Sequence, residues 1–456
     1  MSSCDTNIEV ANPRTGGGQE VITKTYCRRF WILLVFSLLA GFQGQQWNTW
    51  SPIGASMEAA YPGWGSSTVA MMANWGPITF LIFVAPMCWL MNTRGLRVSV
   101  VTCAAMMSVG TLLRCIHTPP AAFTALCHVC AFLVGTSGTI MLAAPPLLAA
   151  DWFPPRERTT ATAVPIVANQ LGTALSYLEP LVVRAPGGAA TPADIRSDVS
   201  TLLSVEAGIA ATLLVMTVAY FPSRPPSPPS ITSAAPRLEY RAALAAIVRN
   251  RDALLVFASY GLSSIPWEAV LSYYLSSLGI QQEEASWLGV VAVVSSAAAG
   301  LLAARLTDLL YGHALTCVLA LMLTSVGALY WLCLLSWGTI PAAKWQIYAS
   351  VIGGMAVNFG ATPLFVELAV ELAYPCPEGV VTGFMVAVLN FTGAVFLFLF
   401  FIPNIGYSWV VYYLLGSCVA CALPLLLVRE DYARSSIDRR RRLGRSLDGD
   451  ADSRAC

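Results

Sequence analysis

Amide and indole side chains gather in one otherwise apolar stretch near the N-terminus. Residues 30–55 carry no charge, yet they contain the run Gly41-Phe-Gln-Gly-Gln-Gln-Trp47-Asn48-Thr-Trp50-Ser-Pro52. An amide without a partner is costly in hydrocarbon, so these groups should face a protein interior or a water-filled cavity. Trp47 and Trp50 are three residues apart and would share one face of a continuous helix. Two interpretations stay open: a substrate path in which Trp47, Asn48 and Trp50 bind the ligand, or a polar seam between helices.

Acidic residues in other apolar stretches indicate proton chemistry. Glu367 and Glu371 lie four residues apart on one face of a predicted helix, and Glu268 interrupts another apolar stretch. A buried carboxyl group that can bind and release a proton is what a proton-coupled carrier requires. We therefore predict a coupling role for Glu367, Glu371 or Glu268. Glu371 lies near the end of its stretch, where pairing with a gate arginine, Arg156 or Arg158, is the alternative.

Four further residues are candidates to bind a small ligand. Gln170, in Asn169-Gln170-Leu-Gly172, could orient a hydroxyl or an amine, or could be a helix-packing amide beside a close-contact glycine. Tyr260 and Trp267 interrupt one apolar stretch, where Trp267 could close an aromatic box with Trp47 or could simply fill space. Asn390 could fix a hydroxyl group. The glycosylation sequon that Asn390 begins lies within a predicted span, out of reach of the modifying enzyme.

Other chemistries find no comparable support. Cys127-His-Val-Cys130 and Cys418-Val-Ala-Cys421 match a metal or redox spacing, but each lies in an apolar stretch without a second pair nearby. No nucleotide-binding loop, catalytic triad or metal-binding helix occurs. We therefore expect neither an enzyme nor a metal site, cofactor or disulfide framework. The 26 basic and 25 acidic residues give no overall field that would attract nucleic acid.

The composition is that of a polytopic membrane protein. Of 456 residues, 56% are hydrophobic and 11% are charged, whereas soluble proteins carry about 25% charged residues. Twelve apolar runs are long enough to span a bilayer. They lie at about 30–55, 67–91, 98–116, 121–149, 159–183, 201–221, 252–276, 287–304, 314–335, 346–372, 380–402 and 409–428.

Basic residues orient these runs, because cytoplasmic loops are rich in Lys and Arg. With both tails in the cytoplasm, only Arg114, Arg184, Arg196 and Lys344 of the 26 basic residues fall on the other side. We expect a cytoplasmic tail at 1–29, a six-helix bundle at 30–221, a partly disordered Pro/Ser-rich cytoplasmic linker at 222–251, a second six-helix bundle at 252–428 and a basic cytoplasmic tail at 429–456. The protein should be a monomer whose partners are the lipid bilayer, a small metabolite and a proton.

Two loop motifs occupy corresponding places in the two halves. Asn92-Thr-Arg94-Gly95-Leu-Arg97 follows the second run, and Arg305-Leu-Thr-Asp308 follows the eighth. Both resemble the loop signature of the major facilitator superfamily, with Asn92 where the pattern has Asp. The segment from Trp152 to Ala161, which contains Arg156 and Arg158, also resembles that superfamily. The resemblance implies an all-α fold of 12 transmembrane helices in two six-helix bundles, with these residues in a cytoplasmic gate or clasp.

Longer segments resemble the feline leukaemia virus receptor-related transporters. They are Trp47-Asn-Thr-Trp-Ser-Pro-Ile53, Arg94-Gly-Leu-Arg97, Tyr220-Phe-Pro-Ser-Arg-Pro-Pro-Ser-Pro-Pro229 and Tyr374-Pro-Cys-Pro-Glu-Gly379. One branch of that family implies proton-driven transport of pyridoxine across the lysosomal membrane, and other branches imply choline, ethanolamine or haem. The resemblance also implies ligand-binding roles for Gln170 and Trp267. The plasma membrane is the alternative location, and a non-transporting receptor or scaffold is the alternative class.

Overall fold

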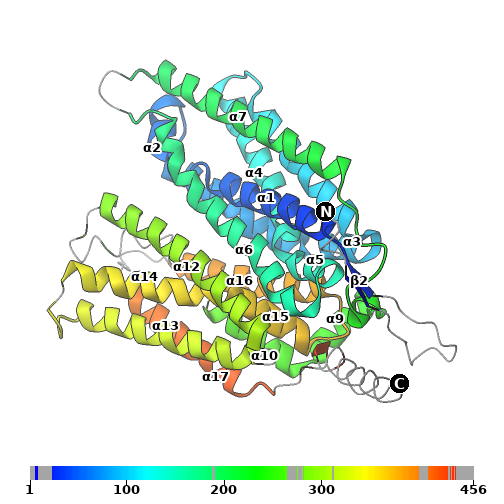
Figure 1. Ribbon diagram of the computed structural model, residues 1–456. Helices are drawn as coiled ribbons and strands as arrows, with labels where there is room; N and C mark the ends of the chain where they lie inside the picture. The colour runs from blue at the N-terminus through cyan, green and yellow to red at the C-terminus, as the bar shows by residue number, and fades with distance from the viewer. Residues whose placement is uncertain are drawn as a thin grey trace, which may run out of the picture.

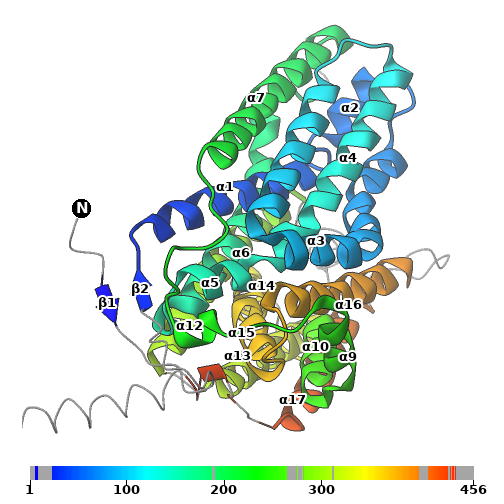
Figure 2. The same ribbon diagram turned by 90° about the vertical axis from the view of Figure 1, so that its right-hand side faces the viewer.

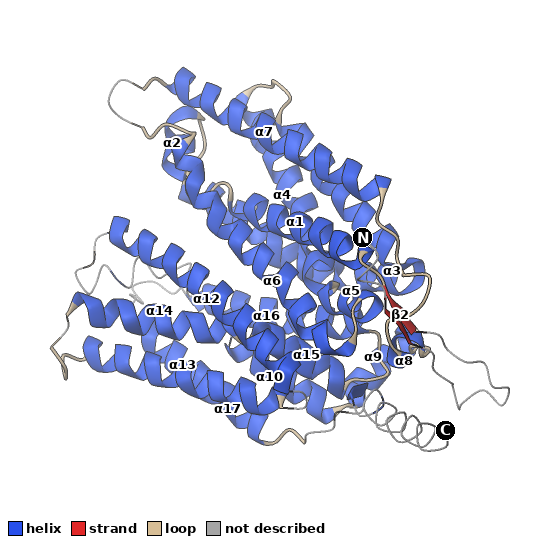
Figure 3. Cartoon of the chain, viewed as in Figure 1, coloured by secondary structure: helices blue, strands red, loops and turns tan. Residues whose placement is uncertain are grey.

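Helices make up most of the chain that the computed structural model describes (Figure 1). The description covers residues 6–8, 23–186, 190–263, 275, 280, 282–310, 313–341, 343–399, 409–429, 432, 434, 435 and 437. Trp267 and Glu268, two of the predicted site residues, lie outside these ranges. Two short antiparallel strands in the N-terminal tail, β1 (Thr6–Ile8) and β2 (Thr23–Thr25), were not expected from the sequence (Figure 3).

The first bundle is formed by the N-terminal half of the chain. Its long helix α3 covers two of the expected spans and turns between them at Gly95, whose φ of 82° is a conformation that favours glycine. Its last helix, α7, begins with a capping box in which Thr191 and Asp194 satisfy each other's backbone N–H groups. Its elements are α1 (Arg28–Asn48), α2 (Gly54–Ala60), α3 (Ser66–Arg114), α4 (Pro120–Ala143), α5 (Pro145–Trp152), η1 (Pro155–Glu157), α6 (Arg158–Leu175), η2 (Ser176–Leu181) and α7 (Pro192–Ala219).

The second bundle repeats this construction with the C-terminal half of the chain. Here one expected span is divided into two helices, because Pro363 lies at the start of α15 and cannot continue the hydrogen bonding of α14. The elements are α10 (Arg251–Ser263), α12 (Gln282–Leu310), α13 (Ala314–Ser336), α14 (Lys344–Gly360), α15 (Thr362–Leu372), α16 (Glu378–Phe398) and α17 (Val410–Leu426).

Seven of the described helical stretches are long and apolar enough to cross a membrane. They are Ser67–Arg114, Pro120–Ala143, Pro192–Ala219, Trp287–Leu309, Ala314–Ser336, Lys344–Leu372 and Glu378–Phe396. The four other expected spans fall on shorter or more polar helices. These are α1, α10, α17 and the pair formed by α6 and η2. The helical, multi-span fold is thus confirmed, and the count of twelve spans stays a prediction.

One expectation about local structure was wrong, and a second, about the linker, stays a prediction. Helix α1 ends at Asn48, so Trp50 lies in the following turn and does not share a helix face with Trp47. Pro52 accounts for this end, because proline has no N–H to donate to the carbonyl four residues earlier, here that of Asn48, and its ring would clash with that carbonyl. The linker at 222–251, expected to be partly disordered, contains two helices, α8 (Ile231–Ala234) and α9 (Tyr240–Arg249).

The apolar cores show how the two bundles are joined. One core cluster contains residues of both halves, such as Ile32 and Leu148 with Phe365 and Val386. Two further clusters are confined to one half each, around Trp64 in the first bundle and Phe396 in the second. Among the described residues, the core that the two bundles share therefore lies at one end of the molecule. Figure 1 shows the same arrangement: the bundles meet near the linker and diverge away from it. Figure 2 views the molecule from the linker end.

Candidate functional site

The predicted ligand residues of the first bundle lie near the end of α1. Trp47 donates a hydrogen bond from Nε1 to the carbonyl oxygen of Ala73 at 2.9 Å, and 37% of the residue is exposed. Asn48 donates from Nδ2 to Ser176 Oγ in η2 at 2.7 Å. Gln170 of α6 is half-buried, and its side chain makes no hydrogen bond with the described part of the chain. Trp47 and Gln170 thus keep surface with which a ligand could be bound.

Other residues of the same stretch have structural contacts. The Asn169 Nδ2 atom donates to Ala40 O and to Gln43 Oε1, both at 2.8 Å, which joins α6 to α1. A Cβ at Gly172 would lie 1.8 Å from the carbonyl oxygen of Gly41, so these helices touch through their backbones. Gln43 therefore lies in a polar seam, the second interpretation offered by the sequence, whereas Trp47 bonds to α3 through its indole N–H and stays partly exposed.

Trp50 has a different environment from the other predicted ligand residues. Only 3% of it is exposed, and its ring packs 5.1 Å from the ring of Trp64. The guanidinium of Arg114 lies over the Trp50 ring at 5.4 Å. This environment is a packed core beside a buried charge.

The predicted ligand residues of the second bundle lie on α10 and α16. Tyr260 is buried, with its ring 5.6 Å from that of Phe365. Asn390 is half-buried, and its Nδ2 donates to Val386 O of its own helix at 2.9 Å. No contact among the described residues joins Tyr260 or Asn390 to Trp47. The aromatic box of Trp47 with Trp267 cannot be placed, because Trp267 is outside the described ranges, and it stays a prediction.

A buried polar cluster in the first bundle was not predicted as a site. It joins Arg114 of α3 to Glu206 of α7 at 2.9 Å, and Gln45 of α1 to Glu179 of η2 at 2.6 Å. The sequence held a signal for it. Arg114, Glu179 and Glu206 are each a charge within an apolar run, and charges in membrane spans are seldom without function.

The two bundles are clasped at the linker end by Asp308. Its carboxylate, on α12, accepts hydrogen bonds from the backbone N–H groups of Thr159 and Thr160 at 3.0 and 2.8 Å and from Thr160 Oγ1 at 2.6 Å. These donors form the first turn of α6 in the other bundle, where a helix N-terminus attracts negative charge. Asp308 thus holds the second bundle to the first.

The arginines of the same segment have different environments. Arg158 is buried, and its guanidinium donates to Ser230, Thr232 and Ser233 of the linker, at 3.2 Å for Thr232 and 3.0 Å for Ser233. Arg156 is exposed. The suggested pairing of Glu371 with Arg156 or Arg158 is therefore absent from the described contacts.

Glu367 and Glu371 face the C-terminal tail. The carboxylate of Glu367 lies 3.5 Å from Arg434 Nη1, and that of Glu371 accepts from Ser435 N and Oγ at 3.1 and 2.6 Å. Arg434 is 1% exposed and also approaches Glu378 at 3.9 Å. A cavity of about 30 Å³ lies beside both carboxylates. The two predicted coupling residues, Glu367 and Glu371, thus both lie at the linker end.

The first loop motif also lies at this end. Arg97 donates from its backbone N to Ser223 Oγ and from Nη2 to Val218 O, both at 3.0 Å, which ties the Gly95 corner to the start of the linker. Asn92 is half-buried and Arg94 is exposed, and neither makes a hydrogen bond with the described part of the chain.

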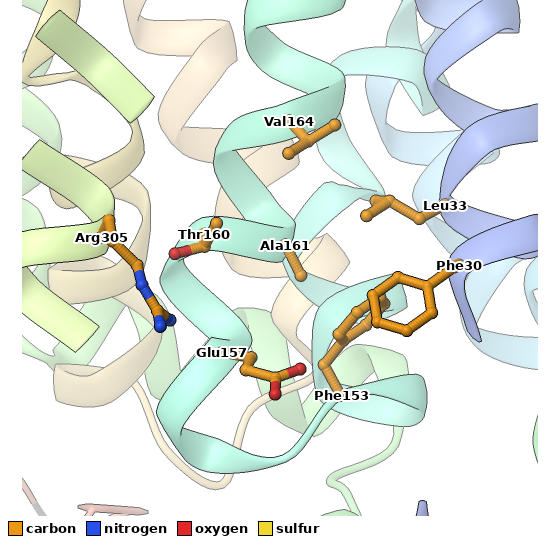
Figure 4. A pocket seen from close by; sticks show the side chains of 8 residues that line it. All are labelled: Phe30, Leu33, Phe153, Glu157, Thr160, Ala161, Val164 and Arg305. Carbon is orange, nitrogen blue, oxygen red and sulfur yellow. The ribbon is translucent and has the colours of Figure 1, made fainter. Parts of the chain in front are cut away.

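A larger cavity, of about 340 Å³, opens beside the clasp and is distinct from the predicted ligand residues (Figure 4). Its wall is largely apolar, and its polar edge contains Glu157, which pairs with Arg29 at 3.1 Å. In Figure 4 Arg305 approaches from α12, across the cavity from the phenyl rings. It is lined by Phe30, Leu33, Phe153, Glu157, Thr160, Ala161, Val164 and Arg305.

Comparison with known proteins agrees with this architecture. A family model of the Major Facilitator Superfamily matches residues 36–395. The solute carrier family 49 member 4 homolog of Xenopus tropicalis is 34% identical over 431 residues, covering 91% of this chain and 94% of that protein. The choline/ethanolamine transporter FLVCR1 of Felis catus is 26% identical, over 84% of this chain and 69% of that protein.

Solved structures share the fold at low identity. The proton:xylose symporter XylE superposes with a TM-score of 0.66 at 14% identity, over 88% of this chain and 96% of that one. A bacterial homologue of the iron transporter ferroportin, in an outward-facing state, gives 0.62 at 13% identity, over 88% and 98%. This chain therefore belongs to the major facilitator superfamily of membrane transporters and, within it, to the feline leukaemia virus receptor-related transporters, the group that includes the solute carrier family 49 member 4 homologues.

Proposed function

We propose that this membrane transporter is a secondary carrier that moves pyridoxine together with protons across the lysosomal membrane by alternating access. The observation that carries alternating access is the distribution of the cores: the halves share one core at the linker end and have separate cores at the other. If the linker is cytoplasmic, as its basic residues indicate, the described state is closed to the cytoplasm. A receptor or scaffold would not need two bundles that share a core at one end and have separate cores at the other.

The choice of pyridoxine rests on the family branch. The relative with 34% identity is a solute carrier family 49 member 4 homolog. Pyridoxine and the lysosome are what the resemblance of the sequence to that branch implies. The partly exposed indole of Trp47 suits either a pyridine ring, by offset stacking, or a quaternary amine, by cation–π attraction. Choline or ethanolamine, named in the more distant feline relative, is therefore the second candidate substrate.

Proton coupling needs a carboxyl group that changes its partner during the cycle. Glu367 and Glu371 fit this role, since both are buried and both are paired with the tail at the closed end. When that end opens, these pairings must break, and a proton on Glu367 would compensate for the loss of Arg434. Glu268, the third predicted coupling residue, stays a prediction from the sequence alone.

The test is uptake by cells that carry the protein at their surface, with labelled pyridoxine and labelled choline supplied in separate assays. The outside would be acidic or neutral, which reproduces the two sides of a lysosome. We expect pyridoxine uptake that rises when the outside is acidified, with little choline uptake. Choline uptake alone would transfer the proposal to the second substrate, and uptake of neither would support the receptor or scaffold class.

A further inference from the structure

The buried cluster in the first bundle is a continuous hydrogen-bonded network. Gln45 Nε2 donates to Glu179 Oε1 at 2.6 Å and to Glu206 Oε1 at 2.7 Å. Gln46 Nε2 donates to Gln45 Oε1 at 2.9 Å, and Arg114 Nη2 donates to Gln46 Oε1 and to Glu206 Oε2. The network joins α1, α3, η2 and α7, and its Glu179 and Glu206 side chains are 95% or more buried.

The cluster contains one positive charge for two carboxylates. Arg114 is its only cation among the described residues, and α1 contributes the uncharged Gln45, Gln46 and Thr49. The other titratable groups near Arg114 are the thiols of Cys115, the residue after α3, and of Cys127 and Cys130 on α4. Thiols carry no charge at acidic or neutral pH. One negative charge is therefore uncompensated in a buried site, where an unpaired charge is costly.

One carboxylate oxygen is open to a further ligand. Glu179 Oε2 is buried without a hydrogen bond of normal geometry from the described residues, although Thr49 lies nearby. The other three carboxylate oxygens of the pair all accept hydrogen bonds. The ligand that fits must bring one positive charge and a bond to this oxygen.

The amide orientations favour a proton over a metal ion. Arginine can only donate, so Gln46 must present its oxygen to Arg114 and its Nε2 to Gln45. Gln45 must then present its own Nε2 to both glutamates. A metal ion would need several oxygen ligands, but the groups between these carboxylates are N–H donors.

We propose that Glu179 and Glu206, held by Gln45 and Arg114, form the site that binds the transported proton on the side away from the linker. The inference rests on the proposed proton-coupled transport and assigns its proton to a different place from Glu367. Glu179 accepts the proton on Oε2 and releases it as the bundles change their arrangement. The pair Glu367–Arg434 then acts at the other end of the molecule, as the gate that the proton meets on leaving.

The site is linked to the predicted ligand residues through two short elements. Gln45 lies on the last turn of α1 with Trp47 and Asn48, and Glu179 follows Ser176 in η2. Asn48 and Ser176 are themselves hydrogen-bonded at 2.7 Å. Protonation of Glu179 weakens its hydrogen bond with Gln45, because a neutral carboxyl is a poorer acceptor. The hydrogen bonding at the end of α1 therefore changes when Glu179 binds the proton.

The first experiment compares Glu179→Gln with the parent in the surface-uptake assay with labelled pyridoxine. Glutamine cannot exchange a proton, so we expect the acid-stimulated uptake to fall at least tenfold. Exchange of labelled for unlabelled pyridoxine at equal pH should persist, because it requires no net proton movement. The control is Glu284→Gln, near the start of α12 and half-buried. Hydrogen bonds from Lys344 and Tyr348 lower the pKa of Glu284, so it stays ionised when the outside is acidified.

The outcomes separate this inference from the proposed function. If the parent responds to outside pH and Glu179→Gln responds equally, the proton site is elsewhere and the inference is overturned. If the parent does not transport pyridoxine, the proposed substrate is wrong, and the site is tested without it. For that purpose, infrared difference spectra of the purified full-length protein are recorded between neutral and acidic pH.

In these spectra the protonated-carboxyl band of the parent should contain a component that Glu179→Gln lacks and Glu284→Gln keeps. Glu206→Gln, with the same number of carboxyls as Glu179→Gln, provides the second variant if the first does not fold. In Glu206→Gln the single negative charge of Glu179 is compensated by Arg114, so Glu179 should no longer take up a proton. The acid-induced component should therefore disappear in this variant too. A component that survives both substitutions would contradict the proposal.

Discussion

Asn169 and Gln170 are neighbours in the sequence, yet they have different environments. Asn169 bonds to Ala40 and Gln43 of α1, whereas the Gln170 side chain has no hydrogen bond with the described residues. Successive helical residues point about 100° apart, so only one of two adjacent amides can face a given neighbour. The sequence left Gln170 open between binding a ligand and packing against a helix. It could not decide, because the choice depends on the side from which α1 approaches.

Trp47 is the residue that best separates the candidate substrates. In Trp47→Phe a ring remains for stacking, worth roughly 0.5–1.5 kcal/mol, but the face that attracts a cation is weaker. We expect this variant to keep most pyridoxine transport, whereas Trp47→Ala loses it. Asn48, Gln170 and Asn390 would fix the hydroxyl groups. Initial rates of pyridoxine uptake check this, and a Phe variant as inactive as the Ala variant would argue against the aromatic contact.

Glu367 is predicted to act at the closed end. Glu367→Gln removes its exchangeable proton and its ion pair with Arg434. We expect proton-driven uptake to collapse while pyridoxine binding, measured at equilibrium on the purified protein, persists. Because Glu367 faces the tail, its substitution should remove the dependence on cytosolic pH, whereas Glu179→Gln removes the dependence on outside pH. An unchanged response to cytosolic pH in Glu367→Gln would transfer the role to Glu371 or Glu268.

At the scale of elements, α1 and α6 pack through their glycines. The positions of the helices could be predicted from the apolar runs, and Gly41, Gly44 and Gly172 could be recognised as small residues. That they face one another across one interface could not, because glycines also serve as turns and kinks, as Gly95 does. The end of α1 was misjudged for a related reason: composition measures apolar length, but Pro52 decides where the helix stops.

Gly172→Ala tests this interface. The added methyl group would overlap the Gly41 carbonyl, so the helices must separate. Overpacking of this kind costs roughly 1–3 kcal/mol. We expect the midpoint of thermal unfolding in detergent to fall for Gly172→Ala. Gly208→Ala on α7 is the matched control, since nothing lies within 4 Å of its added Cβ, and it should leave the midpoint unchanged or raised.

At the scale of the whole molecule, three separate segments close the linker end. They are Asp308 of α12, the linker residues that bond to Arg158, and the tail around Arg434. The loop motif and the basic linker could be located in the sequence, and the cytoplasmic side expected for them stays a prediction. Burial of Arg434 beside Glu367 could not, because a basic tail is ordinarily solvated and its partner is 67 residues earlier in the chain.

The Asp308 clasp makes a prediction about the balance between the two open states. Asp308→Asn leaves a neutral side chain in place of a carboxylate that accepts two backbone N–H groups of α6. Hydrogen bonds to a charged group contribute roughly 1.5–3 kcal/mol, so the closed linker end should lose about tenfold or more in population. Spin labels at the exposed positions Glu58→Cys and Thr339→Cys would report the separation of the bundles at the far end.

We expect a shorter label separation in Asp308→Asn, because opening the linker end brings the far ends together when rigid bundles rock about a fixed middle. The matched control is Asp252→Asn, an acidic residue whose carboxylate accepts from Arg429 N within the second bundle. Losing that bond does not release one bundle from the other, so the separation should match that of the parent. The same shortening in both variants would point to a general loosening of the second bundle. No shortening in Asp308→Asn would mean that the linker and the tail hold the end closed without the clasp.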